Sequence, residues 1–236
     1  MEKKLQNRTR FMPLGVAVRE NEDGTESRKI GGKAICFNEV TTLWDGKYYV
    51  EREVISPSCI TEEFLREQDV KLNLMHNRNE TVCRCNKGEG TLKMEIRPDG
   101  LYWEAEMPKC DIGDRALELV RNKTLTGCSF EFWPEEYTES ITTLADGRED
   151  ELITHTKFKA LTALTIAMDP AYAGTSVDER EAFEKREKDH ETKEAQREEE
   201  AKAEAEKREA EKKTRERKIR EYQREIEMME IENNKL

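Results

Sequence analysis

The stretch that decides the fold is a glycine, two small nucleophilic side chains and an alternating apolar pattern: Thr126-Gly127-Cys128-Ser129-Phe130-Glu131-Phe132. A glycine that leads into Phe-Glu-Phe alternation predicts a turn feeding a β-strand. The start of such a strand can hold the Ser129 hydroxyl at a surface while the phenylalanines anchor the backbone beneath it. Serine after glycine is also common in ordinary turns, so a structural role for Ser129 is the alternative.

The candidate partner of Ser129 is His76, which directly follows the alternating stretch 70–75. A serine hydroxyl is a poor nucleophile near neutral pH and needs a base within hydrogen-bond reach, and imidazole titrates in the right range. If the two side chains meet, the chemistry is nucleophilic acyl transfer. Cys128 is a rival nucleophile, but on a strand it points to the opposite face from Ser129. Of the other two histidines, His155 precedes a strand and His190 lies in a charged, solvated tail.

Around this stretch the patterns predict several antiparallel strands and two short helices, and therefore a mainly β protein of the α+β class. Predicted hairpins span 11–38, with a turn at 21–24, and 90–107, with a turn at 98–100; further strands lie at 48–55, 70–75 and 151–168. We expect polar loops at 77–80 and 140–150, and the Ser129 strand to close at 133–134. Short helices are expected at 62–67, capped by Thr61, and at 114–122, capped by Asp114.

The charge is concentrated at the C-terminal end of the 236-residue chain. From Asp178 to Leu236 about two-thirds of the residues are charged, and none is glycine or proline. Such a segment cannot build a globular core, but its composition favours one long helix supported by charge pairs three and four residues apart. We therefore expect a flexible N-terminus at 1–10, a folded domain at 11–176 and a helical tail at 177–236.

The end of this tail carries a short apolar seam with the 3-4 spacing of a coiled coil. Its members are Ile219, Tyr222, Ile226, Met229, Asn233 and Leu236, with Asn233 at a position that could fix the register. The seam covers fewer than three heptads, which is marginal alone. A solvated, partly frayed helix is the alternative to an assembly helix.

Composition also excludes several functions. A net charge of −11 argues against nucleic-acid binding, and no apolar run approaches the ~20 residues that span a membrane. The N-terminal residues lack an apolar signal core, so we expect a cytosolic protein whose six cysteines stay reduced. The only close cysteine pair is Cys83-Arg84-Cys85, without a second pair at zinc spacing. We therefore expect neither a metal nor a cofactor.

Six segments, in order, resemble the prohead protease family of tailed phages, maturation peptidases with a herpesvirus-protease-like fold. They are Ile30–Ala34 with Phe37, Glu53–Pro57, Leu72–Asn77, Asp99–Leu101, Gly127–Phe132 and Asp169–Tyr172. The resemblance covers roughly residues 10–176. It implies a β-barrel serine endopeptidase with Ser129 as nucleophile and His76 as general base. It further implies a homodimer or a higher self-associated form. The enzyme is expected to act inside the phage procapsid in the host cytoplasm, cleaving the major capsid protein's N-terminal region, the scaffold, or itself.

One position departs from the family pattern. Relatives usually carry an acidic third catalytic residue shortly before the Pro-Ala pair, and Ala163 stands there in this chain. The role of orienting the base is therefore open to Thr162, Thr165 or His155, or a Ser-His dyad suffices. A missing orienting group can lower the rate by orders of magnitude.

Three hypotheses remain from the sequence. The first is a maturation protease whose helical tail docks it to, or serves as, the internal scaffold, with self-cleavage between Gly174 and Glu184 at the exposed domain boundary. The second is a scaffold protein with an inactive protease fold, which the Ala163 departure favours. The third is a thiol protease that uses Cys128 with His76.

Overall fold

The structure is a computed structural model that describes residues 7–12, 15–21, 26–168 and 177–233. The chain divides into two compact units, residues 1–184 and 185–236, each described by itself. The first unit holds two β-sheets and short helices, and the second belongs to one long helix. The fold is thus mainly β with short helices and a long C-terminal helix, as the sequence predicts.

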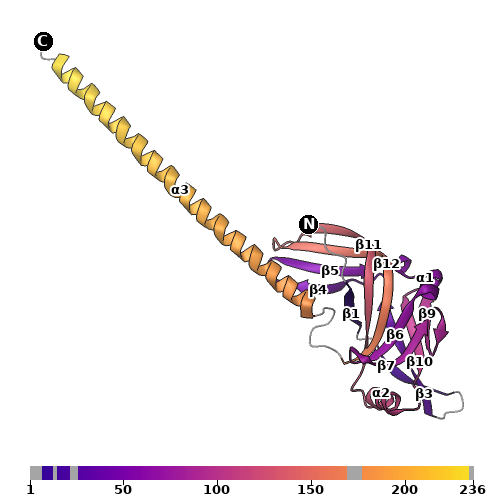
Figure 1. The fold of residues 1–236 in the computed structure, drawn as a ribbon. Helices are drawn as coiled ribbons and strands as arrows, with labels where there is room; N and C mark the ends of the chain where they lie inside the picture. The colour runs from indigo at the N-terminus through magenta and orange to yellow at the C-terminus, as the bar shows by residue number, and fades with distance from the viewer. Residues whose placement is uncertain (1–6, 13–14, 22–25, 169–176, 234–236) are drawn as a thin grey trace. The chain divides into compact units, whose positions relative to one another are not determined.

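The larger sheet is built on two long central strands, β11 and β12, which run side by side through the first unit (Figure 1). Its strand order is β1 (Arg8–Met12), β11 (Gly127–Thr143), β12 (Glu149–Ala167), β6 (Asp69–Leu74), β7 (Asn77–Asn86) and β8 (Glu89–Gly90). Beyond this path, β5 (Tyr49–Ile55) pairs with β12, and β4 (Thr41–Asp45) pairs with β5.

The smaller sheet contains the two predicted hairpins. Its strand order is β2 (Ala17–Glu20), β3 (Glu26–Cys36), β10 (Gly100–Glu106) and β9 (Leu92–Arg97). The turn expected at 98–100 lies between β9 and β10, whereas the turn at 21–24 falls mostly outside the described residues. A Cβ atom added at Gly31 would lie 2.7 Å from the Trp103 carbonyl oxygen, so this glycine allows β3 and β10 to approach closely.

Short helices lie at opposite ends of the first unit, α1 (Glu62–Glu67) beside β9 and α2 (Asp111–Arg121) below β7 in the view of Figure 1. The prediction for α1 is confirmed, since the Thr61 hydroxyl accepts a hydrogen bond from the Phe64 amide. The start predicted for α2 is wrong. That helix begins three residues earlier, after Cys110, and Asp114 lies in its first turn, where a carboxylate also favours the helix dipole.

Three strand predictions are corrected by the sheet pairing. The Ser129 strand does not close at residues 133–134, because β11 continues through bulges to Thr143 and only 144–148 form the turn into β12. Residues 77–80 are not a loop but the start of β7. The sheet is not purely antiparallel either, since β12 pairs in parallel with both β5 and β6. These strands carry polar side chains on their solvent-facing side, so their sequences lack the apolar pattern from which a strand is predicted.

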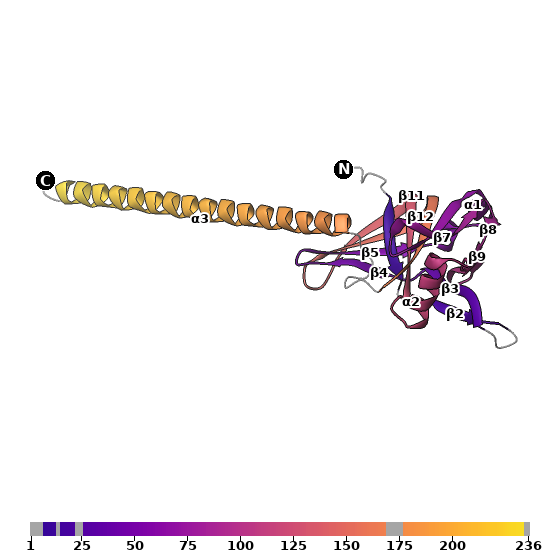
Figure 2. The same ribbon diagram turned by 60° about the horizontal axis from the view of Figure 1, so that its bottom comes forward.

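The boundary expected at residue 10 is also wrong. Residues 8–12 form β1, an edge strand that pairs with β11 and lies beside it in Figure 2, and the Arg10 side chain is only 1% exposed. Residues 1–6 lie outside the described part of the chain. The region Asp169–Tyr172, where the sequence predicts the end of the folded part, lies outside it as well.

The hydrophobic core is shared by both sheets and by α2. Phe130 and Phe132 of β11 are buried in it, together with Trp103 of β10 and Leu117 of α2. The two phenylalanine rings stack with centroids 5.4 Å apart, so they lie on one face of β11. This packing restrains the backbone of β11, and Ser129 lies on the opposite face of that strand.

The C-terminal helix is α3 (Val177–Asn233). Ion pairs four residues apart follow it, as predicted: Arg180 with Glu184, Glu204 with Arg208, and Glu209 with Lys213. Ile219 and Tyr222 of the predicted seam are exposed, Leu236 lies outside the described residues, and the coiled coil stays a prediction. No helix in the described part of the chain is both long and apolar enough to cross a membrane.

Candidate active site

Ser129 lies near the start of β11, and its side chain is buried. Strand alternation places Ser129 and Glu131 on the face opposite Phe130 and Phe132. The register sets Ser129 across from Thr165 of β12, which in turn pairs with Asn73 of β6. Strands β11, β12 and β6 therefore lie side by side at Ser129. The core packing on the other face of β11 restrains the backbone that carries the hydroxyl.

His76 is the second residue of a tight turn between β6 and β7. Leu74 pairs with Asn77, and the two residues between them, Met75 and His76, have φ angles of 52° and 59°. Two consecutive left-handed residues in a two-residue hairpin are the pattern of a type I′ turn, which usually contains asparagine and glycine. A methionine and a histidine here carry backbone strain, which in proteins is concentrated at functional sites.

This turn brings His76 to Ser129. Its Nε2 atom lies 3.1 Å from the Ser129 hydroxyl oxygen, a hydrogen-bond distance. His76 lies at an exposed turn, but its ring is partly desolvated, and this desolvation lowers the pKa of His76 below 6.5; the opposing effect of the Glu131 carboxylate is smaller. The imidazole is therefore neutral at pH 7 and can accept the hydroxyl proton through Nε2.

Glu131 is the acidic group beside this pair, and sequence reasoning missed it. Its side chain is 8% exposed and accepts a hydrogen bond of 3.3 Å from Arg78, at the start of β7. The signal that could have found it was present: Glu131 follows Ser129 by two positions, which on a strand places both on one face. The Phe-Glu-Phe alternation by itself predicts only a strand.

The three residues considered for the orienting role occupy different places. Thr165 is buried across from Ser129, with no hydrogen-bond partner for its hydroxyl among the described residues. The Thr162 hydroxyl donates to the Glu131 carbonyl. His155 packs edge-on against Phe132, with ring centroids 5.3 Å apart, and so lies on the face of β11 opposite Ser129.

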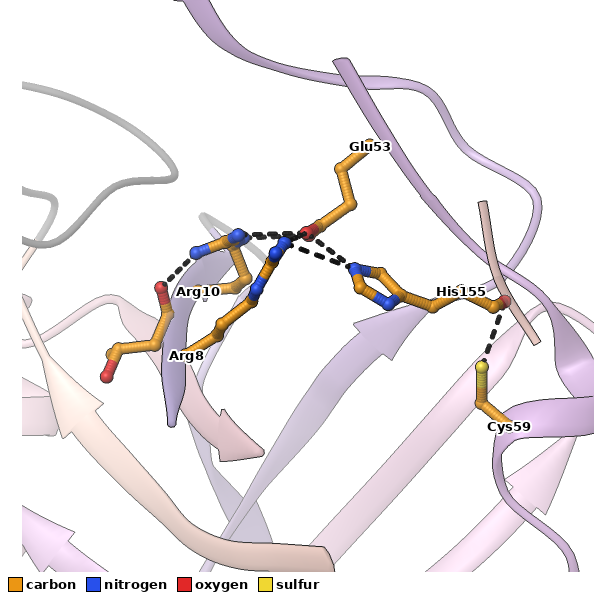
Figure 3. Close-up of polar contacts among 6 residues, drawn as sticks. Arg8, Arg10, Glu53, Cys59 and His155 are labelled. Carbon is orange, nitrogen blue, oxygen red and sulfur yellow. Dashed lines mark hydrogen bonds and ion pairs between the residues drawn. The ribbon is translucent and has the colours of Figure 1, made fainter. Parts of the chain in front are cut away.

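His155 belongs to a separate buried network, drawn in Figure 3. The Glu53 carboxylate accepts two hydrogen bonds from Arg10, at 2.7 and 2.8 Å, and one from His155 Nε2 at 3.0 Å. Arg8 contributes a second guanidinium, 3.3 Å from Glu53. Burial alone would raise the Glu53 pKa, but Arg10 and His155 outweigh it and hold the pKa well below its usual range. This network joins β1, β5 and β12, and its residues are structural supports.

The rival nucleophile, Cys128, points away from His76. Its side chain is fully buried, and burial raises the pKa of its thiol to about 12. A thiol rather than a thiolate is therefore present at neutral pH, and only Ser129 of the two contacts His76. Cys83 and Cys85 are buried strand residues of β7, and nowhere in the described part of the chain do three His, Cys, Asp or Glu residues gather as metal ligands.

Comparison with known proteins places the pair in context. A sequence profile described as caudovirus prohead serine protease matches residues 15–191, a range that includes both His76 and Ser129. Among solved structures, the chain is similar to the bacteriophage T4 capsid assembly protease, gp21. The identity is 11% and the TM-score 0.35, and the match covers 67% of this chain and 97% of that chain. No curated protein matches the chain.

Proposed function

The chain belongs to the caudovirus prohead serine protease family, and from this premise we propose that Ser129 is the nucleophile and His76 the general base of a serine endopeptidase. The observation that carries the assignment is the 3.1 Å contact between the Ser129 hydroxyl and Nε2 of His76. A neutral imidazole and a rigid, core-backed hydroxyl are what nucleophilic acyl transfer requires.

The reaction proceeds in two halves. As the Ser129 oxygen bonds to the scissile carbonyl carbon, its proton passes to Nε2 of His76. The imidazolium then gives that proton to the leaving nitrogen as the C–N bond breaks, which leaves an acyl ester on Ser129. A water molecule then gives a proton to the same Nε2 atom as its oxygen bonds to the ester carbon. The imidazolium returns that proton to the Ser129 oxygen as the C–O bond breaks, which releases the second product.

The proposed substrates are the N-terminal region of the major capsid protein and the scaffold, cleaved inside the procapsid in the host cell. The support is the family's description as prohead proteases. We propose that an extended peptide approaches from the side of the exposed β6–β7 turn, which carries His76.

Co-expression with the cognate capsid protein tests the function. Shortening of the capsid protein is expected with the wild-type protein and is expected to be absent with Ser129→Ala. Ser140→Ala is the matched control, because Ser140 is an exposed serine on the same strand. Equal shortening with Ser129→Ala, or none with any variant, would contradict the proposed function.

Self-cleavage is expected between Gly174 and Glu184. Residues 174–176 lie outside the described part, whereas α3 begins at Val177 and Phe183 is buried against Tyr49 and Leu43. A helical segment must unwind before it enters an active site, so we place the cleavage toward the N-terminal end of this window. Intact-mass analysis over days, beside Ser129→Ala, tests the idea, and full-length masses for both would refute it.

An inactive scaffold is not favoured, because that hypothesis predicts a Ser129 hydroxyl far from His76 and the two are in contact. Self-association stays part of the proposal, either through the protease domain or through the tail seam at Ile219 and Tyr222. Light scattering of the Ser129→Ala protein, with and without Ile219→Ala and Tyr222→Ala, separates the two routes. A monomer in every case would exclude both.

A further inference from the structure

The Glu131 carboxylate is buried, and burying a charged group costs free energy unless nearby charges or hydrogen bonds compensate for it. Only 8% of the side chain is exposed, and its one ion-pair partner among the described residues, Arg78, has a side chain that is 75% exposed. An ion pair with so hydrated a partner compensates little of the desolvation of a carboxylate. The more constrained neighbour is His76, whose pKa the Glu131 charge raises against the effect of burial.

The cross-strand register gives a second reason. Glu131 pairs directly with Ala163, the position where an acid is expected from the family resemblance. Directly opposed residues of neighbouring strands project from the same face with Cβ atoms about 4.5–5.5 Å apart. A carboxylate on residue 131 and a methyl group on residue 163 therefore place an acid in nearly the same region as the reverse arrangement would.

Resting on the proposed function, we propose that Glu131 supplies the acid missing at position 163 and acts on catalysis as a positioning residue through His76. Nε2 of His76 faces Ser129, which leaves Nδ1 for a carboxylate. Hydrogen bonds of this kind are often long in the free enzyme and tighten in the substrate complex. The Glu131 carboxylate holds the tautomer with hydrogen on Nδ1 and stabilises the imidazolium that forms when His76 takes the Ser129 proton.

The charged groups around this acid are few. Arg78 of β7 contacts it directly, and Lys71 of β6 lies opposite Ala163 in the next strand, where it pairs with Asp69 at 3.8 Å. The neighbour on β1 is the uncharged Thr9. The competing explanation is that Glu131 merely anchors Arg78 and the β7 strand. Arg78→Gln removes that anchor while it retains the carboxylate, and so it is the matched control.

The first test does not depend on activity. In the Ser129→Ala background, the imidazole signals of the three histidines of the chain are followed in a pH titration by NMR. Glu131→Gln is expected to lower the His76 pKa relative to this parent, whereas Arg78→Gln is expected not to lower it. An unchanged His76 pKa in folded Glu131→Gln would overturn the proposal, and failure of the proposed protease function would not affect this measurement.

The second test uses kinetics on a peptide that the wild-type protein cleaves. Glu131→Gln is expected to lower kcat by about 10²-fold or more with a smaller change in KM, because the imidazolium loses its support. Arg78→Gln is expected to retain activity within about threefold. Equal kcat for Glu131→Gln and wild type, at an unchanged melting temperature, would overturn the role.

A swap of the acid across the strand pair makes the test specific. Glu131→Ala alone is expected to be as impaired as Glu131→Gln, and Glu131→Ala with Ala163→Glu is expected to recover at least tenfold of the lost kcat. A purely structural Glu131 does not predict rescue from the neighbouring strand. A folded double variant with no more activity than Glu131→Ala would refute the equivalence of the two positions.

Discussion

His76 reaches Ser129 from a different strand because its backbone is left-handed at the tip of the β6–β7 hairpin. With φ at 59° the chain reverses within two residues, and Nε2 comes to lie 3.1 Å from the Ser129 hydroxyl oxygen. A longer loop would let the imidazole move relative to Ser129. The tight turn instead ties His76 to the same sheet that holds Ser129, which limits their relative motion.

The pH dependence of cleavage should report the environment of His76. Its pKa lies below 6.5 because of burial, so the neutral base is present at pH 7 and is lost only in more acidic solution. We expect kcat/KM to rise with pH along a limb whose midpoint lies below 6.5 and to be flat at pH 7. Measurement on a peptide substrate between pH 4.5 and 8 checks this, and a midpoint above 6.5 would contradict it.

Thiol reactivity should separate Cys110 from the other five cysteines. Cys110 alone is exposed, and burial raises the pKa of both Cys59 and Cys128 to about 12. We expect one thiol to react quickly with a chromogenic disulfide in the native protein and six in denaturant. Cys110→Ser should abolish the fast reaction. Rapid labelling of Cys128 in the native protein would revive the thiol-protease hypothesis.

The buried Arg10–Glu53 pair should dominate the acid stability of the domain. Folding lowers the Glu53 pKa from 4.5, so its stabilisation is complete well above pH 4.5 and declines as the pH falls below that value. Glu53→Gln removes the carboxylate that accepts two hydrogen bonds from the buried Arg10, and it should lower the free energy of unfolding at pH 7 by about 3 kcal/mol. It should also flatten the dependence of stability on pH below 4.5.

Urea unfolding of Glu53→Gln and the parent, both in the Ser129→Ala background, measures this. Asp69→Asn is the control, because Asp69 forms a comparable pair with Arg84 at the exposed surface and should lose only a small fraction of that stability. A loss from Glu53→Gln no greater than the loss from Asp69→Asn would show that the buried network is dispensable.

The first turns of α3 should contribute to the stability of the domain. Phe183 packs against Trp44, with ring centroids 5.5 Å apart, and its carbonyl accepts a hydrogen bond of 3.2 Å from Tyr49. Phe183→Ala should destabilise the first unit by about 2 kcal/mol, the value of a buried phenylalanine. Lys202→Ala, an exposed change on the same helix and outside the tail seam, should leave the thermal transition unchanged. Equal transitions for both variants would contradict the packing.

The sequence by itself determined the parts of this protein that short-range chemistry encodes. The alternation of apolar and polar residues predicted the strands around Ser129 and before His76. The Thr61 cap predicted α1, and the charge-rich composition predicted α3. These patterns depend on residues two to four positions apart, and local geometry converts them directly into strands and helices. The pairing of Ser129 with His76 was also within reach, because each stands at the edge of a recognisable strand.

Only the tertiary structure decided which strands are neighbours and which faces are buried. The placement of Glu131 across from Ala163, and of Arg10 against Glu53, depends on register between segments far apart in the chain. Register is set by the collective burial of one sheet face, which no local window contains. For that reason the sequence could not show that His155 joins the network of Glu53 and Arg10, or that the Glu131 carboxylate lies near His76.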